Sequence, residues 1–479
     1  MFNLISGVFR KCYFVLVLVL GMGRVQAQDR DSLILTRQET PYIVGEISIK
    51  GNRVTKAYII ERELLFKPGD RVYIADLVLA FKLSRQQIIK THLFNDAIIY
   101  LKEFRGYTID IQIEVKERWY IFPLPYARPV DRNLTTWSEK NYSLSRLDYG
   151  LKYSQYNVTG RNDNLQAWLI TGYSRQFDFA YDQPYADKSL KHGFGAAFSY
   201  VAMTELDAFT QNNQQYFIDA DTIAYAGRYL GEQLSFSLRY YYRPGLKTRH
   251  FLRLGFNWLN IDSAVSVWNP QYLDHGERKV FYPEFSYFLN YNNLDYTPYP
   301  LHGNLLETGI LKRGIDKNMN LWQLNVRNVA SWKLARRLYF STQDLGILKL
   351  PFEQPFFNQQ LFGYGDFYMR GLEKYVVEGV GGGISRNSFL RELFNFNIPF
   401  LRGTSHDLIP VRIFAKIYGD GGYIYNKYPT PTNTLSNSFL YSGGFGVDVV
   451  TFYDLVFRFE CSFNQLGEKG LFFHVSNYF

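Results

Sequence analysis

The sequence has little of what usually carries catalytic or redox chemistry. Its 479 residues include two cysteines, Cys12 and Cys461, and seven histidines that are scattered along the chain. Neither a Gly-x-Ser-x-Gly nor a His-Glu-x-x-His motif occurs, so the usual signatures of a serine hydrolase and of a zinc peptidase are missing. We therefore expect a protein that is not an enzyme and that uses no metal and no cofactor.

The charged residues do not form the basic face that a nucleic-acid partner requires. The 53 Lys and Arg residues outnumber the 44 Asp and Glu residues, which gives a formal net charge of +9. The basic residues are interspersed with aromatic residues, whereas DNA- and RNA-binding proteins gather them in a patch or stripe. We therefore predict no nucleic-acid partner.

The strongly apolar stretch near the start of the chain is too short to cross a bilayer as a helix, which takes ~20 residues. Residues 1–27 instead have the form of a secretory signal peptide. Arg10 and Lys11 precede an apolar segment, and Val25-Gln26-Ala27 offers a small-x-small cleavage site. Cys12 would leave with this segment, so Cys461 would remain alone and no disulfide within the chain is expected.

What the sequence has in excess is aromatic residues. It contains 39 Tyr and 40 Phe, and Phe, Trp and Tyr together make up 18% of the chain. Membrane β-barrels carry such residues in girdles at both bilayer interfaces. On composition alone, a large aromatic-rich β-sandwich is an equal alternative.

After a polar linker at residues 28–41, residues 42–118 read as one small α/β domain. Its expected elements follow in the order strand, helix, helix, strand, strand, near 42–52, 55–66, 73–94, 95–104 and 107–117. The last strand alternates apolar and polar side chains from Ile109 to Val115, as a strand with one buried face does.

From residue 119 to 479 the helical periodicity is lost, and alternating segments follow one another. In residues 234–242 Leu, Phe and Tyr alternate with Ser and Arg, and residues 147–153, 252–258 and 455–463 show the same pattern. One face is almost entirely Leu, Phe, Tyr and Trp while the other mixes charges with Gly, as lipid outside and a wet lumen require. Only a closed barrel satisfies the backbone in lipid. We therefore predict a transmembrane β-barrel of about 16 antiparallel strands.

The small domain resembles a POTRA domain, the periplasmic module of polypeptide-transport barrels. The matching residues are Gly51-Asn52, Thr55, Arg62, Gly69-Asp70, Leu93-Phe94 and the closing Ile113 to Glu117. Together with the barrel, the chain resembles a single-POTRA member of the BamA/TamA superfamily of outer-membrane assembly and translocation proteins, with a surface-antigen-type barrel. The resemblance implies the outer membrane of a Gram-negative bacterium, with the POTRA domain in the periplasm. The chain end is similar to the insertion signal of outer-membrane barrels, with Phe479 last and Asn477 as a departure.

The resemblance also gives a role to an arginine in the aromatic-rich stretch "FGYGDFYMRGLEKY". The sixth extracellular loop of the superfamily folds into the lumen and carries Val-Arg-Gly and an aromatic residue at its tip. Here the tetrapeptide is Met369-Arg370-Gly371-Leu372. An ordinary turn in a porin loop is the alternative interpretation.

In the superfamily the acidic partner of this arginine lies in an Asp-x-Gly pattern on a late strand, which matches Asp420-Gly421-Gly422. We therefore expect Arg370 and Gly371 to form a latch with Asp420 and Gly421. A second partner on the preceding strand would be Asn395, or Glu392 if a bulge shifts the register.

The superfamily further implies two edges that bind polypeptide. The first is an edge strand of the POTRA domain, expected at Asn95, Ala97, Ile98, Ile99, Tyr100 and Leu101. It would add a client segment by β-augmentation. The second is a seam between the first barrel strand, expected near 144–154, and the last, at 471–479. Its expected residues are Leu147, Tyr149, Val475, Asn477 and Phe479.

These features predict an outer-membrane protein assembly factor. It would bind unfolded polypeptide through its POTRA domain and help to insert or fold β-barrel proteins. The expected partners are unfolded outer-membrane proteins or a secreted client, outer-membrane lipids, and accessory periplasmic or lipoprotein subunits. A dedicated polypeptide export channel is the main alternative. A passive porin is a third, but it would leave residues 42–117 without a role.

Overall fold

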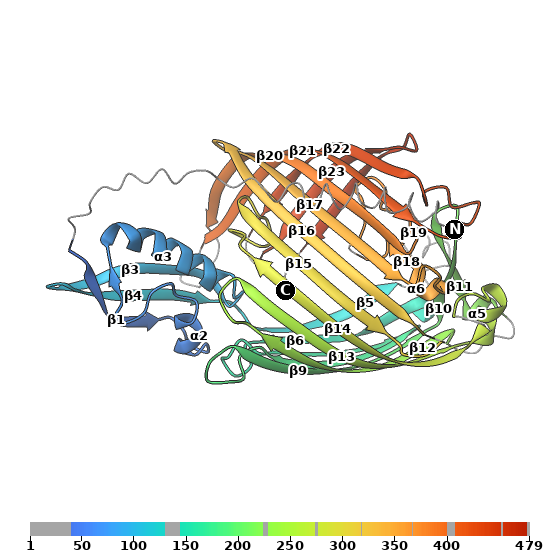
Figure 1. Cartoon of the computed structure of the whole chain (residues 1–479), viewed down its shortest axis with the longest axis horizontal. Helices are drawn as coiled ribbons and strands as arrows, with labels where there is room; N and C mark the ends of the chain where they lie inside the picture. The colour runs from blue at the N-terminus through green and yellow to red at the C-terminus, as the bar shows by residue number, and fades with distance from the viewer. Residues whose placement is uncertain are drawn as a thin grey trace, which may run out of the picture.

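The computed structural model describes residues 40–129, 144–223, 229–273, 276–317, 319–365, 367–399, 408–451 and 454–476. It has two parts, a small α/β domain and a large cylinder of tilted strands (Figure 1). The small domain lies at one end of the cylinder, which we call the POTRA end. The opposite, far end carries four short elements: β10 (Glu205–Gln211), β11 (Gln214–Asp219), α5 (Ser263–Trp268) and α6 (Phe356–Gln359).

The small domain has the order of elements predicted from the sequence, with one short strand added. Its elements are β1 (Tyr42–Lys50), α2 (Ala57–Glu61), β2 (Arg71–Val72), α3 (Ile74–Ile89), β3 (Phe94–Arg105) and β4 (Thr108–Glu117). The sheet order is β2-β1-β4-β3, with β1 and β4 parallel and the other pairs antiparallel. Strand β3 is therefore an edge strand.

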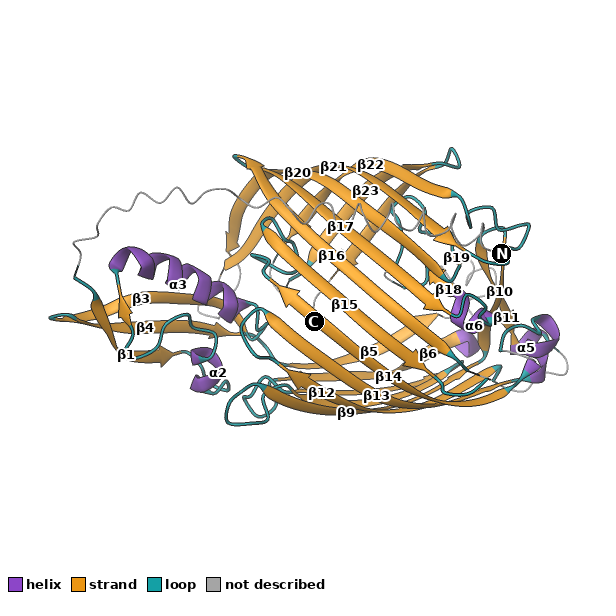
Figure 2. Cartoon of the chain, viewed as in Figure 1, coloured by secondary structure: helices purple, strands orange, loops and turns teal. Residues whose placement is uncertain are grey.

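The helices of this domain pack on one face of its sheet (Figure 2). Alternate residues of β4, Ile111 and Ile113 among them, are fully buried against Ile59 of α2 and Ile88 of α3. Helix α2 is shorter than predicted and ends at Glu61, and Thr55 does not cap it. The hydroxyl of Thr55 instead contacts Tyr120 and Asn157 at the barrel.

The cylinder is a single sheet of 16 strands, all of whose pairs are antiparallel. The strands are β5 (Ile121–Pro129), β6 (Leu147–Tyr156), β7 (Asn164–Gly172), β8 (Arg175–Gln183), β9 (His192–Met203), β12 (Gly231–Tyr242), β13 (Thr248–Ile261), β14 (Lys279–Asn292), β15 (Gly303–Arg313), β16 (Leu321–Ala335), β17 (Leu338–Leu350), β20 (Gly381–Pro399), β21 (Leu408–Tyr425), β22 (Phe439–Val450), β23 (Val456–Asn464) and β24 (Lys469–Ser476). Two 3-10 turns, η1 (Leu144–Arg146) and η2 (Ala220–Thr222), lie in the connections. The predicted fold class and strand count are confirmed.

The first barrel strand is not the one predicted. The sheet order ends at β5, and β6 lies between β5 and β7. Leu147 and Tyr149 are therefore on the second strand, away from the seam. The prediction passed over β5 because Pro123 and Pro125 interrupt its pattern, and proline is found in sheets mainly on edge strands.

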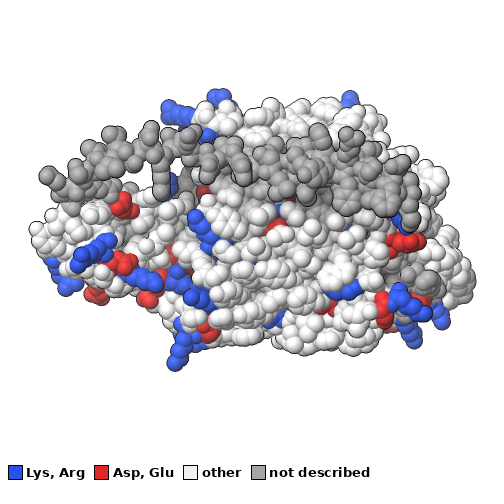
Figure 3. Space-filling model, viewed as in Figure 1, with Lys and Arg blue, Asp and Glu red and all other residues white. Residues whose placement is uncertain are grey.

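The strands turn their apolar residues outward and their polar residues into the lumen. On β13, Leu254 and Trp258 are 40% and 46% exposed, whereas Asn257 is 4% exposed. In Figure 3, Lys, Arg, Asp and Glu gather over the small domain and toward the ends of the cylinder, and the wall between them is mostly uncharged. An apolar outer belt around a polar interior is the surface of a barrel that spans a membrane.

Within the ranges that the structure describes, no helix is long and apolar enough to cross a membrane.

Candidate functional site

The connection between β17 and β20, residues 351–380, carries Arg370 to the inner wall of the barrel. The Arg370 guanidinium donates through Nε to Oδ2 of Asp420 on β21 at 2.8 Å and through Nη2 to Oδ1 of the same carboxylate. The Arg370 backbone N–H also donates to Oδ2, at 3.3 Å. Both side chains are buried. The structure thus brings together the two residues that the sequence paired.

Four other residues complete the surroundings of Arg370. Its Nη1 donates to Oγ of Ser388 at 2.9 Å, and Nη2 donates to the carbonyl oxygen of Asn387 at 3.3 Å. The Tyr418 ring centroid lies 4.0 Å from the guanidinium carbon, and a Glu460 oxygen lies 3.9 Å from Nη1. The planar guanidinium is therefore held by charge, hydrogen bonds and ring stacking together, as burial of an arginine requires.

The two glycines of the predicted latch differ in what they contribute. Gly371 has φ +84°, and a Cβ there would lie 3.0 Å from the Cβ of Ser462. A side chain at this position would be strained both in its backbone and in its contact. At Gly421 an added Cβ would only reach the ring of Phe439 at 3.4 Å. The close approach therefore needs glycine at 371.

Neither predicted second partner contacts Arg370. Asn395 lies seven residues beyond Ser388 along β20, which at ~3.4 Å per residue is far out of reach. The bulge expected near Glu392 is present, but Glu392 pairs with Arg412 at 2.8 Å. The second acid is Glu460 of β23, which lies on a different strand from the two predicted partners.

At the far end, three connections pack on one another over the lumen. Asn433 of the β21–β22 connection donates to the carbonyl oxygen of Thr210 and to Glu378, and it accepts from the backbone N–H of Asn213. Strands β18 (Gln360–Phe362) and β19 (Val377–Glu378) pair within the Arg370 connection. These contacts join the Arg370 connection to the hairpin of β10 and β11 and to the β21–β22 connection at the far end.

At the POTRA end, the turn between β14 and β15, residues 293–302, reaches across to the opposite wall. The Tyr299 ring lies 4.8 Å from that of Phe414 on β21, and its hydroxyl donates to Asp448 on β22 at 2.9 Å. Tyr299, Leu301 and Val450 belong to one buried apolar cluster. The local sequence does not indicate this contact, because it is made with strands more than 100 residues away.

Asp454, in the turn between β22 and β23, joins this crossing turn to the small domain. It accepts from Tyr296 of the turn, from Arg118 at 2.8 Å, and from His92, whose ring nitrogen lies at 2.9 Å. Burial opposes its ionisation, but the bonds to His92 and Arg118 outweigh this and hold the pKa of Asp454 well below its usual value. The contact therefore contributes stability at neutral pH that is lost only in strong acid.

A second buried contact docks the small domain on the turn between β12 and β13. Glu63 is fully buried, and its Oε2 accepts from Nη2 of Arg243 at 2.8 Å. Arg243 also donates to the hydroxyl of Tyr185 at 2.6 Å, and Arg62 donates to the carbonyl oxygen of Leu190 at 2.7 Å. Burial lowers the pKa of Arg243, but the Glu63 carboxylate outweighs it, so the net shift is upward.

The predicted polypeptide-binding strand is β3, and it lies at the free edge of its sheet. Ala97 is buried, while Ile98 and Tyr100 are exposed on the other face. Ile99 and Leu101 pack partly against the domain core. Asn95 is near the barrel end of the strand, at a bulge in the register with β4. At Ala97 this edge is already occupied, because the Ala97 N–H donates to Oδ1 of Asp96 at 2.8 Å and its carbonyl oxygen accepts from Nε of Arg85 at 2.7 Å. Beyond Ala97, toward Arg105, the backbone groups of this edge are available to an added strand.

The edge of β5 that faces away from β6 is poor in hydrogen-bond donors. The N–H of Tyr156 donates to the carbonyl oxygen of Tyr120 at 2.8 Å, so the even-numbered residues of this strand bond toward β6. In a strand, successive residues direct their N–H and C=O groups to opposite neighbours. Pro123 and Pro125 therefore lie on the other edge and offer it no N–H.

Strands β5 and β24 are the two ends of the sheet order. Val475 lies on β24, opposite Phe457 of β23, and is half exposed on the outer face. Asn477 and Phe479 lie outside the described residues. No ladder joins β5 and β24 within the ranges that the structure describes.

We expect Tyr299→Ala to release the crossing turn. The substitution removes a buried ring and the bond to Asp448, a loss of about 3–5 kcal/mol by comparison with other buried aromatic residues. Hydrogen–deuterium exchange of residues 293–302 should rise by two orders of magnitude or more. Tyr299→Phe, which loses only the hydroxyl, should show a much smaller rise. Unchanged exchange in Tyr299→Ala would mean that the turn is not held by this contact.

No protein-family model matches the sequence, and no curated protein does. Among solved structures, the chain is similar to BamA from Haemophilus ducreyi lacking POTRA domains 1–3, with 15% identity and a TM-score of 0.48, over 91% of this chain and 84% of that chain. It is also similar to CdiB from Escherichia coli, with 11% identity and a TM-score of 0.46, over 94% and 92% of the two chains. A third similar structure is CdiB from Acinetobacter baumannii, with 12% identity and a TM-score of 0.46, over 91% of this chain and 73% of that chain.

At these identities and scores the role of each residue has to be argued from the contacts of this chain. Those contacts define a lumen that the Arg370 connection enters from the far end, where it binds the inner wall, and that residues 293–302 enter from the POTRA end. The chain is a 16-stranded β-barrel with one POTRA-like α/β domain docked at the end of its lumen.

Proposed function

We propose that this chain is an outer-membrane protein assembly factor that binds unfolded polypeptide through its POTRA-like domain and helps β-barrel proteins to insert or fold. The observation that carries the proposal is the edge of β5. Pro123 and Pro125 withhold two N–H donors from the side on which β5 would meet β24. A seam with missing ladder bonds opens more easily than any other strand pair of the sheet, and an opened edge is a template for a client strand.

The free edge of β3 gives the client its first binding site. An extended segment that pairs with β3 gains main-chain hydrogen bonds, and the exposed Ile98 and Tyr100 offer it apolar contacts. Strand β3 begins at Phe94, next to the contact of His92 with Asp454 at the barrel. A segment bound beyond Ala97 therefore has one end directed toward the barrel, in the periplasm if the domain lies on that side of the outer membrane.

The alternative, an export channel for one partner protein, requires a path through the lumen. Two segments enter that lumen, one held by Asp420 on the inner wall and one held by Asp448. Both would have to be displaced for a polypeptide to pass. Insertion at the wall needs neither to move, and for this reason we favour the assembly function over the channel.

The proposal is tested by restoring the missing donors with Pro123→Thr and Pro125→Thr. Two added ladder bonds should stabilise the closed seam by about 1–3 kcal/mol. We expect the barrel to unfold at a higher temperature in gel-shift assays and the rate at which it folds a small outer-membrane barrel into liposomes to fall several-fold. Pro410→Thr, on β21 and away from both ends of the sheet order, is the matched control.

Two results would contradict this account. If the double variant were more stable and folded the client at the unchanged rate, opening of the seam would not be part of the activity. If its stability were unchanged, the edge at Pro123 and Pro125 would not face β24.

A further inference from the structure

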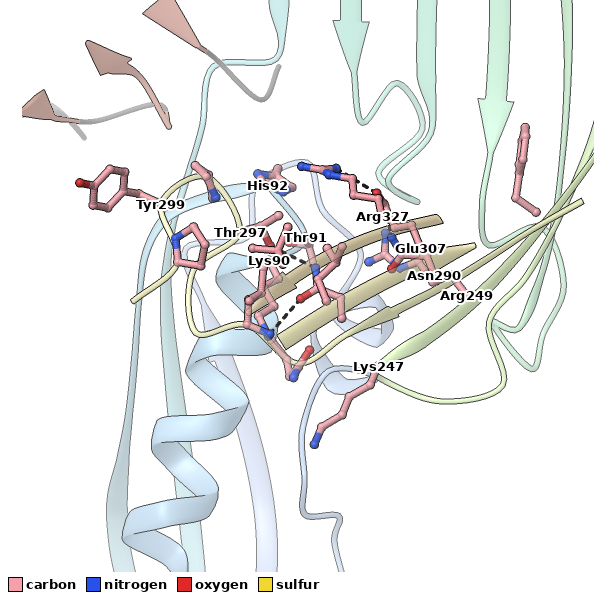
Figure 4. A pocket seen from close by; sticks show the side chains of 18 of the residues that line it. Lys90, Thr91, His92, Lys247, Arg249, Asn290, Thr297, Tyr299, Glu307 and Arg327 are labelled. Carbon is pink, nitrogen blue, oxygen red and sulfur yellow. Dashed lines mark hydrogen bonds and ion pairs between the residues drawn. The ribbon is translucent and has the colours of Figure 1, made fainter. Parts of the chain in front are cut away.

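A cavity of about 760 Å³ lies in the lumen of the barrel, between the end of α3 and the latch at Arg370. Lys90, which follows α3, Lys247 in the β12–β13 turn, and Arg249 at the start of β13 line it (Figure 4). Arg249 points into the lumen because it has the parity of Arg253 and Asn257, whereas Leu254 and Trp258 face outward. Three cations from the small domain and from the barrel therefore line one cavity, with the Lys247 side chain pointing away from the other two in Figure 4.

These three cations have no acidic partner within the part of the chain that the structure describes: no ion pair and no side-chain hydrogen bond joins them to an acid. The nearby acids are occupied. Glu63 is bound by Arg243, and Glu307 is bound by Arg327 at 2.9 Å and by Asn290.

Asp295, the remaining acid beside Lys90, already serves as a cap for its own turn. Its Oδ1 accepts backbone N–H bonds from Tyr296, Leu301 and His302 at 2.9–3.1 Å. Burial lowers the pKa of Lys90 to about 8; Asp295 opposes this fall, while Lys247 and Arg249 add to it. Burial is the largest of these effects, and an anion bound beside Lys90 would raise its pKa again.

The position of the cations selects among possible anions. Lys90 to Leu93 line the cavity, and β3 begins at the next residue, Phe94. A segment paired with the free edge of β3 therefore runs toward the cavity at this end. The cavity faces the lumen and not the apolar outer belt, so a segment of polypeptide reaches it more directly than the headgroup of a bilayer lipid does.

We propose that Lys90, Lys247 and Arg249 form a binding site for an acidic, extended segment of a client polypeptide. The inference rests on the proposed function and adds a chemical preference to it: clients are held by main-chain pairing along β3 and by carboxylates at its barrel end. Attraction between opposite charges inside a cleft also speeds the encounter.

The test uses the purified full chain in detergent and a short fluorescein-labelled peptide of alternating Glu and Thr. Its affinity is measured by fluorescence anisotropy at low salt, next to a peptide in which Gln replaces each Glu. We expect the acidic peptide to bind more tightly, and Lys90→Gln with Lys247→Gln and Arg249→Gln to weaken it about tenfold, the sum of three exposed charge pairs. Added salt should weaken it as well.

The matched control replaces three exposed lysines elsewhere on the small domain: Lys50→Gln, Lys67→Gln and Lys82→Gln. It makes the same change in net charge outside the cavity, and it should leave the affinity unaltered. An equal loss of peptide affinity in both triple variants would show that only the overall charge matters and would contradict the proposed site.

A second ligand separates the proposal from a lipid site. If soluble dihexanoyl phosphatidylglycerol bound and lost affinity in the cavity variant while the acidic peptide did not, the cations would serve a phospholipid headgroup. Peptide binding is measured without any barrel client. A failure here therefore leaves the seam experiment unaffected, and a failure of the seam experiment leaves this binding unaffected.

Discussion

Replacing Arg370 with alanine is expected to free the connection that binds the inner wall of the barrel, at a loss of about 3–5 kcal/mol in the stability of the bound form. The substitution leaves two buried acids without the positive charge of their arginine partner. Asp420 is fully buried, and Glu460 would keep Lys416 at 2.8 Å and His474 at 3.5 Å as its partners. The rate of hydrogen–deuterium exchange in residues 367–378 should therefore rise by two orders of magnitude or more. The barrel itself should still shift on a gel as a folded species.

Two further variants make this result specific to the guanidinium. Arg370→Lys keeps the charge but loses the paired bonds to Asp420 and the stacking on Tyr418, so an intermediate effect is expected. Lys374→Ala changes an exposed cation of the same connection and should have no effect. If Arg370→Ala exchanged no faster than Lys374→Ala, the latch would not hold the connection in place.

Replacing Glu63 with alanine is expected to release the small domain from the barrel. The change leaves Arg243 and Arg62 close together in a buried interface without their shared acid, which by comparison with other buried pairs costs about 3–5 kcal/mol. Spin labels on α3 and on a barrel turn should change from a narrow to a broad distance distribution. The unfolding temperature of the barrel should stay the same.

Glu61→Ala is the control for this change, because Glu61 is exposed two residues away on the same turn of chain. It should keep the narrow distribution. Arg243→Ala should reproduce the broad one, since it breaks the same pair from the barrel side. A narrow distribution in Glu63→Ala would show that the contacts at Asp454 suffice to dock the domain.

The sequence predicted those parts of the fold that depend on local pattern. Alternation identified the outward and inward faces of β6, β12, β13 and β23, because each strand has lipid on one side and a polar lumen on the other. It missed β5, where Pro123 and Pro125 hide the pattern. The same prolines that made the strand hard to recognise are those that define its free edge.

The candidate site was predicted where a resemblance gave the pairing, and it was missed where the contact joins distant segments. The pairing of Arg370 with Asp420 was predicted because each residue lies in a short motif that matches the superfamily. The contact of Arg370 with Glu460, that of Tyr299 with Asp448, and the pair of Glu63 with Arg243 join residues 90 to 180 positions apart. Nothing in the local pattern of either partner indicates such a contact, because register and loop path decide it.

The most direct test of the assembly function is quantitative proteomics of the outer membrane after depletion of this protein. The account predicts that many unrelated β-barrel proteins decrease together, and that the wild-type chain restores them while the chain with Pro123→Thr and Pro125→Thr does not. Loss of a single protein, with all other barrels at their normal level, would contradict it and would identify the chain as the exporter of that protein.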